Sequence, residues 1–131
     1  MEEFVAVGTK DEILGLNDIT IEKIPVPEWK KTVFMKGMTA SERDDWEAEM
    51  FVLRKKGDVA GMTDFRARFV SRCLCNEKGE LLFSAKDVKD LGAKSAKAID
   101  RLFDAAQEIN GMRKKDIEKG VENLPEGQSV V

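Results

Sequence analysis

A regular apolar stripe near the end of the chain limits its fold more than any other feature of the sequence. Between residues 94 and 111, apolar side chains recur at helical spacing and charged side chains fill most positions between them. This period predicts an amphipathic α-helix, whose apolar face another element must cover. Asn110-Gly111 is a typical helix end. The stripe consists of Ala96, Ile99, Leu102, Phe103, Ala106 and Ile109.

A second helix is predicted from about residue 40 to residue 56, just before Gly57. Thr39 and Glu42 have the spacing of a capping box, in which each side chain accepts a hydrogen bond from a free amide of the first turn. Acidic residues occupy the first turns and basic residues the last, an order that complements the helix dipole. Three apolar residues predict its buried face: Trp46, Met50 and Leu53.

Two further helices are shorter. One begins near Thr63 or Asp64 and keeps a helical apolar period through Leu74. The other is capped by Ser84 and runs through about Asp90. A short helix is also expected between residues 10 and 16, ahead of everything described so far.

Two β-rich runs, residues 19–24 and 33–36, predict a small hairpin before the long helices. Pro25 and Pro27 lie in the segment between them, and proline favours an edge strand because it cannot donate to a ladder hydrogen bond. An isolated hairpin is marginal in water, so we expect it to pack on the helices. The predicted fold is therefore α+β and predominantly helical, with an N-terminal β-hairpin followed by about four to five α-helices.

The chain has room for one domain, since it holds 131 residues of which 42% are hydrophobic. We divide it into an acidic N-terminal segment (1–18), a single α+β domain (11–112) and a polar, partly disordered tail (113–131). The N-terminus lacks the basic and apolar regions of a signal peptide. No stretch approaches the roughly 20 apolar residues of a membrane span. We therefore expect a cytoplasmic protein with no membrane partner.

The chain contains no histidine and no tyrosine. Histidine is the commonest general base and the commonest metal ligand, so its absence argues against an enzyme. Cys73 and Cys75 would point to different faces of a helix, which suits neither a disulfide nor a zinc site. We predict a non-enzyme with no catalytic residue, cofactor or metal, and two buried or half-buried reduced thiols.

Basic residues raise the alternative of a small DNA-binding regulator. Arg66, Arg68 and Arg72 lie close together, and residues 113–115 add a further basic run. The net charge of −3 and the lack of a basic stripe argue against binding to the phosphate backbone of nucleic acids. We therefore expect no nucleic-acid partner.

Aromatic and methionine side chains give the remaining functional signal. Trp29 follows Pro27 at a loop tip, where an aromatic ring needs a core pocket or a partner protein. Met35, Met38, Met50 and Met62 cluster around the hairpin and the first long helix. Methionine is common at adaptable binding surfaces. It also fills small cores, which is the simpler interpretation here.

Several short motifs follow one another in a fixed order. Val26-Pro27-Glu28-Trp29 is followed by Met38-Thr39-Ala40-Ser41-Glu42-Arg43, and Leu102-Phe103 by Asn110-Gly111. This order resembles that of the tail assembly chaperones of long-tailed bacteriophages and prophages, over roughly residues 11–112. The family often has Gly-Gly after the tryptophan, where this chain has Lys30-Lys31. The motif residues are Pro27, Glu28, Trp29, Thr39, Glu42, Arg43, Leu102, Phe103, Asn110 and Gly111.

The resemblance implies a chaperone domain that binds and solubilises the tape measure protein and recruits tail tube (major tail) subunits in the host cytoplasm. It also implies self-association into a spiral or helical oligomer, absence from the mature virion and a longer frameshifted form. We place the partner-binding surface around Trp29, Met38, Trp46 and Met50, unless these side chains form the core. The alternative function is a head–tail connector or adaptor, which would remain in the phage particle.

Overall fold

The computed structural model describes residues 6–57 and 63–112, and the predicted hairpin is present in it. Strands β1 (Ile21–Val26) and β2 (Lys31–Lys36) pair antiparallel, with Ile24 opposite Val33 and Pro25 opposite Thr32. β1 is an edge strand, as the prolines predict, because the sheet order is β1-β2-β3.

The third strand corrects the sequence prediction. The helix expected to continue through Leu74 ends at Ser71, and Leu74–Cys75 form the short strand β3 instead. β3 pairs antiparallel with β2, where Phe34 lies opposite Cys75 and Met35 opposite Leu74. A short apolar run fits a buried helix and a buried strand equally well, so its period could not decide between them.

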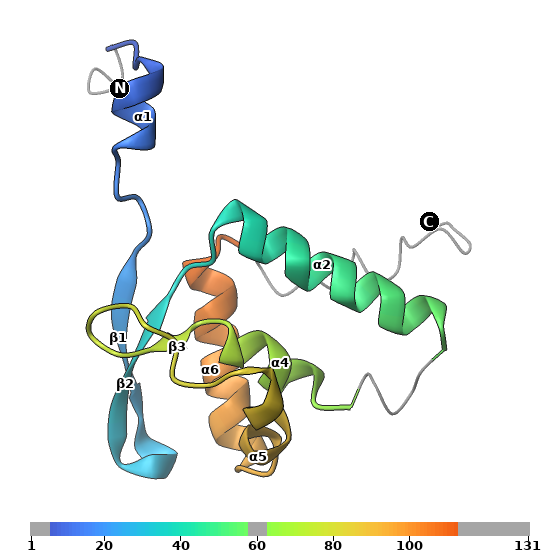
Figure 1. Cartoon of the computed structure of the whole chain (residues 1–131). Coiled ribbons are helices and arrows are strands. Elements are labelled where there is room, and N and C mark those ends of the chain that lie inside the picture. The colour runs from blue at the N-terminus through green and yellow to red at the C-terminus, as the bar shows by residue number, and fades with distance from the viewer. Residues whose placement is uncertain (1–5, 58–62, 113–131) are drawn as a thin grey trace.

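The predicted helices are otherwise confirmed, and the fold is α+β (Figure 1). α2 spans Ala40–Lys55 and α4 spans Phe65–Ser71. The segment capped by Ser84 forms a 3-10 turn, η3 (Ala85–Asp87), that continues into α5 (Val88–Gly92). α6 spans Ala96–Ile109. In the described part of the chain, four α-helices thus follow the hairpin.

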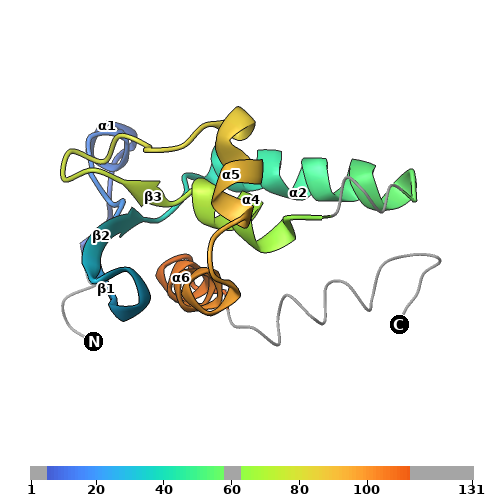
Figure 2. The ribbon, with the colours of Figure 1, turned by 90° about the horizontal axis from the view of Figure 1, so that it is seen from below.

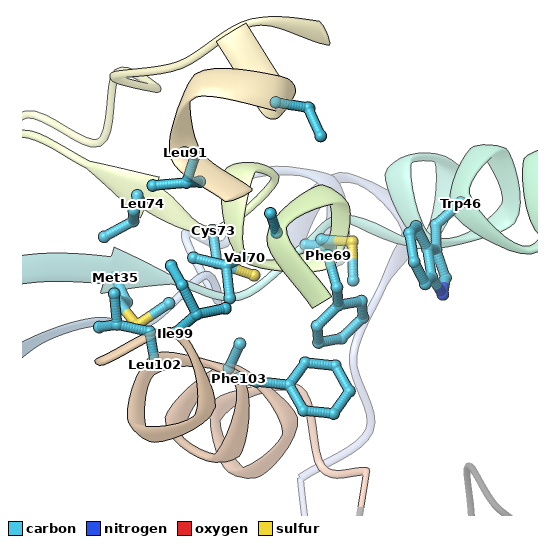
Figure 3. Close-up of a cluster of buried hydrophobic side chains, with 14 of the residues drawn as sticks. Met35, Trp46, Phe69, Val70, Cys73, Leu74, Leu91, Ile99, Leu102 and Phe103 are labelled. Carbon is cyan, nitrogen blue, oxygen red and sulfur yellow. The ribbon is translucent and has the colours of Figure 1, made fainter. Parts of the chain in front are cut away.

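The apolar stripe of α6 supplies the centre of the core. α6 packs against β1, β2 and α4, and Figure 2 shows it beside both the sheet and the other helices. Rings from three elements meet there (Figure 3): Phe69 lies 5.0 Å from Trp46 and 5.4 Å from Phe103, measured between centroids. Leu102 is fully buried. Burying a side chain of this size contributes about 1.5–3 kcal/mol.

The short N-terminal helix α1 (Lys10–Leu14) stands apart from this core. An extended segment connects it to β1, and both views place it away from the other helices (Figures 1 and 2). The short helix expected between residues 10 and 16 is thus confirmed; Thr9 caps it and Gly15 ends it. The tail predicted for residues 113–131 lies outside the described residues.

Candidate functional site

The first family motif forms the hairpin turn and ties it to α6. Pro27–Trp29 make one 3-10 turn, η2, after which Lys30 adopts a left-handed conformation with φ of 54°. Both carboxylate oxygens of Glu28 accept hydrogen bonds from the Arg101 guanidinium, at 3.0 and 2.9 Å. These bonds lower the pKa of Glu28 and raise that of Arg101. The motif therefore fixes the turn against the last helix.

The second motif determines where α2 begins. The Thr39 hydroxyl accepts from the Glu42 amide at 3.1 Å, and the Glu42 carboxylate accepts from the Thr39 amide at 2.8 Å. The predicted capping box is thus confirmed. Arg43, the residue after Glu42, pairs with Glu47 one turn further along the surface of the helix, at 3.6 Å.

The last motif joins three parts of the fold through one amide side chain. Asn110 Oδ1 accepts from the Met38 backbone amide at 2.8 Å, just before α2. Its Nδ2 donates to the Ala106 carbonyl at 2.8 Å and to Cys73 Sγ at 3.5 Å. Gly111 follows with φ of 69°, a conformation that glycine adopts at little cost. With Leu102 and Phe103 in the core, the motif residues serve mainly to build the fold.

Three of the four side chains predicted to bind a partner also lie in the core. Met38 is 9% exposed, Trp46 5% and Met50 3%. Their predicted surface position is therefore corrected. Trp46 and Met50 lie on the apolar stripe by which α2 packs on the core, and Met38, just before α2, belongs to the same core cluster. Trp29 is half-buried and packs against the core from the hairpin turn.

Within residues 6–57 and 63–112, the large apolar side chains that remain exposed lie elsewhere, in three groups. The first group lies on the N-terminal arm (residues 6–20), the second at the α2 tip (residues 51–56), and the third after β3. We call Leu81 and Leu82 of the third group the leucine pair. Ile21 of β1 also belongs to this group, because it lies against Gly79 in the turn that precedes Leu81. Contiguous exposed apolar surface marks sites of protein contact. The side chains are Val7, Ile13, Leu14, Leu16; Phe51, Val52; and Ile21, Leu81, Leu82.

A signal for these side chains was present in the sequence. Phe51 and Val52 fall off the α2 stripe, so the helix cannot bury them on the same side as Met50. The leucine pair directly follows a turn, where an apolar run has no helical or strand period to bury it. Apolar residues outside the periodic stripes were therefore the better candidates for a contact surface.

A groove of about 220 Å³ lies beside the leucine pair. On its polar side, Glu49 accepts from Arg68 at 3.3 Å and from Arg72 at 2.6 Å, which holds α2 against α4. Its apolar lining comes from Leu81, Phe83 and Val88.

The arginines behind the DNA-binding alternative are all engaged with acids. Arg68 and Arg72 share Glu49, and Arg66 pairs with Asp100 at 3.3 Å. Two carboxylates therefore offset two of the three positive charges, which weakens that alternative. The basic run at residues 113–115 lies outside the described residues.

Both cysteines are free and buried. Burial raises the pKa of the Cys73 thiol to about 11 and also raises that of Cys75, so neither is a reactive thiolate near neutral pH. Across residues 6–57 and 63–112, no three His, Cys, Asp or Glu side chains are placed to hold a metal. Nor does any helix in these ranges combine the length and apolarity that crossing a membrane requires.

These features describe a small α+β domain whose motif residues build the fold and whose surface keeps large apolar side chains exposed. A family model described as phage tail assembly chaperone matches residues 15–120. Because the match covers most of the 131 residues, the chain belongs to the phage tail assembly chaperone family.

A solved structure of the bacteriophage HK97 tail assembly chaperone is similar to this chain. The TM-score is 0.53, and the likeness covers 72% of this chain and 84% of that chain at 15% sequence identity. At this identity it concerns the fold alone. No curated protein matches the sequence significantly.

Proposed function

We propose that the chain binds and solubilises the tape measure protein of a long-tailed phage and recruits tail tube subunits around it. It acts in the host cytoplasm by binding rather than by catalysis, associates with itself along the tape measure protein, and leaves before the virion is complete. The observation that carries this proposal is that large apolar side chains stay exposed on a folded member of the tail assembly chaperone family.

A long helical partner exposes apolar stripes until the tail tube encloses it. A chaperone for such a partner needs apolar side chains for the contact and charge elsewhere to keep the complex in solution. This chain offers both, because 36% of its residues are charged while its exposed apolar side chains lie in separate groups. Hydrophobic contact is non-directional, which suits repeated binding along a partner and later release.

We place the tape measure contact on the leucine pair and the groove beside it. Leu81 is 45% exposed and Leu82 51%. An amphipathic helix laid on this surface would bury its apolar stripe against the leucine pair and Phe83, the mode by which helices bind grooves. The ion pairs of Glu49 form a polar rim on the other side of the groove.

Co-expression with the tape measure protein of the same phage tests this proposal. We expect the wild-type chain to increase the soluble fraction of the tape measure protein, and Leu81→Glu combined with Leu82→Glu to abolish the increase, because the contact would then bury unpaired charge. Both leucines are exposed, so the unfolding midpoint of the variant should match that of the wild type.

Lys89→Glu is the matched control, because it changes the net charge by the same amount at an exposed position of α5. It should solubilise the tape measure protein as the wild type does. If the leucine variant solubilised the tape measure protein as well as the wild type does, the contact would not lie on the leucine pair. No increase with the wild type would refute the proposed function.

Mass spectrometry of purified virions tests whether the chain leaves before the virion is complete. We expect none of this chain in them. Its presence in fixed proportion to the other tail proteins would instead favour the head–tail connector.

A further inference from the structure

The N-terminal arm carries apolar side chains that its own chain does not bury. α1 has five residues, a complete capping box and no buried residue. Leu14 is 72% exposed and Leu16 66%. Because an isolated helix this short is marginal in water, capping alone does not account for the arm. A surface that packs on Leu14 and Leu16 would supply the missing stabilisation.

The α2 tip has matching properties. Phe51 is 50% exposed and Val52 46%. Lys55 and Lys56 follow one turn later on the same faces of the helix, and Lys55 Nζ lies 5.7 Å from the centroid of the Phe51 ring. The tip is therefore an apolar surface bordered by positive charge.

The arm and the tip are complementary in charge. The arm carries Asp11, Glu12 and Asp18 against Lys10 alone, whereas residues 51–56 carry Arg54, Lys55 and Lys56 and no acid. An apolar contact bordered by opposite charges favours this pairing over arm-to-arm or tip-to-tip contacts, in which like charges would meet.

We propose that the arm of one copy of this chain docks on the α2 tip of a second copy. Figures 1 and 2 place α1 and the end of α2 on opposite sides of the molecule, so one chain cannot make this contact with itself. Each copy then offers one arm and one tip. Such a heterologous contact produces an open, helical array when its rotation does not close a ring.

This inference deepens the self-association within the proposed function and rests on that function for its biological role. The contact is small, so single copies associate weakly in solution. Copies lined along one long partner are held at a high effective concentration, which strengthens the contact without any new interaction. Assembly is thereby coupled to the presence of that partner.

Sedimentation velocity of the full chain tests the contact, at concentrations from about 10 µM to about 1 mM, which covers weak association constants. We expect the mass of the wild type to grow with concentration past that of a dimer. Leu14→Glu on the arm and Phe51→Glu at the tip should each stay monomeric. Thr32→Glu, at an exposed position of β2 that belongs to neither surface, should assemble as the wild type does.

An equimolar mixture of the two monomeric variants is the decisive measurement. Each variant keeps one intact surface, so the mixture should form dimers and stop there. A wild type that is monomeric throughout, a single variant that assembles normally, or a mixture that stays monomeric would each overturn the proposal.

Charge reversal provides a second test. Lys55→Glu with Lys56→Glu should weaken assembly, and adding Asp11→Lys with Asp18→Lys should restore it; no restoration would contradict the assigned pairing. Failure of the arm-to-tip contact can be told apart from failure of the proposed function. Sedimentation measures self-association of the chain alone, whereas co-expression measures solubilisation of the tape measure protein.

Discussion

Met50 and Phe51 are neighbours in the sequence but differ sharply in what they contribute to stability. Met50 is 3% exposed and Phe51 50%. We expect Met50→Ala to lower the free energy of unfolding by about 2–5 kcal/mol, because it leaves a cavity between α2 and the core. Phe51→Ala should change it by no more than about 0.5 kcal/mol. Urea denaturation measures both, and equal losses would contradict the assigned burial.

Lys30 explains a departure from the family pattern noted in the sequence. The structure gives this residue a φ of 54°, and a side chain in the left-handed region costs about 1–2 kcal/mol. Glycine is common here in the family because it avoids that cost. We expect Lys30→Gly to raise the free energy of unfolding by up to about 1 kcal/mol, after the entropy lost on folding glycine is subtracted.

Thermal unfolding with van't Hoff analysis measures the effect of Lys30→Gly. Lys31→Gly serves as the control, because Lys31 begins β2 and does not have a positive φ, so glycine there adds conformational entropy to the unfolded chain without relieving strain. A lower stability for the Lys30 variant would mean that the left-handed conformation is not strained.

At the scale of elements, two identical capping boxes make a matched pair. Thr9–Glu12 starts α1, which buries no residue, and Thr39–Glu42 starts α2, which packs through Trp46. Thr39→Ala should lower the free energy of unfolding by about 0.5–2 kcal/mol. Thr9→Ala should leave it unchanged, because α1 melts without opening the core. Chemical denaturation separates the two, and an equal loss would show that α1 packs on the domain.

Helices with a clear period or cap could be predicted from local sequence, and β3 could not. Capping boxes and the α6 stripe act within a few residues, so the sequence specifies them directly. Whether Leu74 continues a helix depends on pairing with Met35, which is distant in sequence. Gly92 is the last residue of α5, and the Asp64 carboxylate lies so close to it that a Cβ there would clash. That contact depends on the tertiary structure and has no local signal.

The proposed contact surface was harder to predict than the fold for a related reason. Motif residues such as Glu28 and Asn110 mark positions that the fold needs, and the structure shows them bonded to Arg101 and Met38. Large apolar side chains such as Trp46 and Met50 were attractive binding candidates, but a chain of this size needs them for its core. The leucine pair does follow a turn, outside any periodic stripe, but only the complete core shows that nothing in the described chain covers it.

For the whole molecule, the Glu28–Arg101 pair joins the hairpin turn to the last helix across 73 residues. The hydrogen bonds from Arg101 hold the Glu28 pKa below its ordinary value of 4.5. The ionised pair therefore stabilises the fold at neutral pH, and this contribution is lost as the pH falls below 4.5 and through the lowered pKa.

We expect Glu28→Gln to be less stable than the wild type at neutral pH and equally stable in acid. Urea denaturation at a series of pH values measures the difference. Arg101→Gln removes the same pair and should show the same pH dependence. A difference that persists in acid would mean that Glu28 contributes by packing rather than by charge.

We propose that this tail assembly chaperone binds its partner through exposed apolar side chains rather than through its motif residues. Calorimetric titration with a soluble segment of the tape measure protein, at several temperatures, distinguishes the two. We predict binding with a negative heat-capacity change, the marker of buried apolar surface, and loss of binding when Leu81 and Leu82 are both glutamate. Absence of binding by the wild type, a heat-capacity change near zero, or full binding by the leucine variant would rule out this apolar contact.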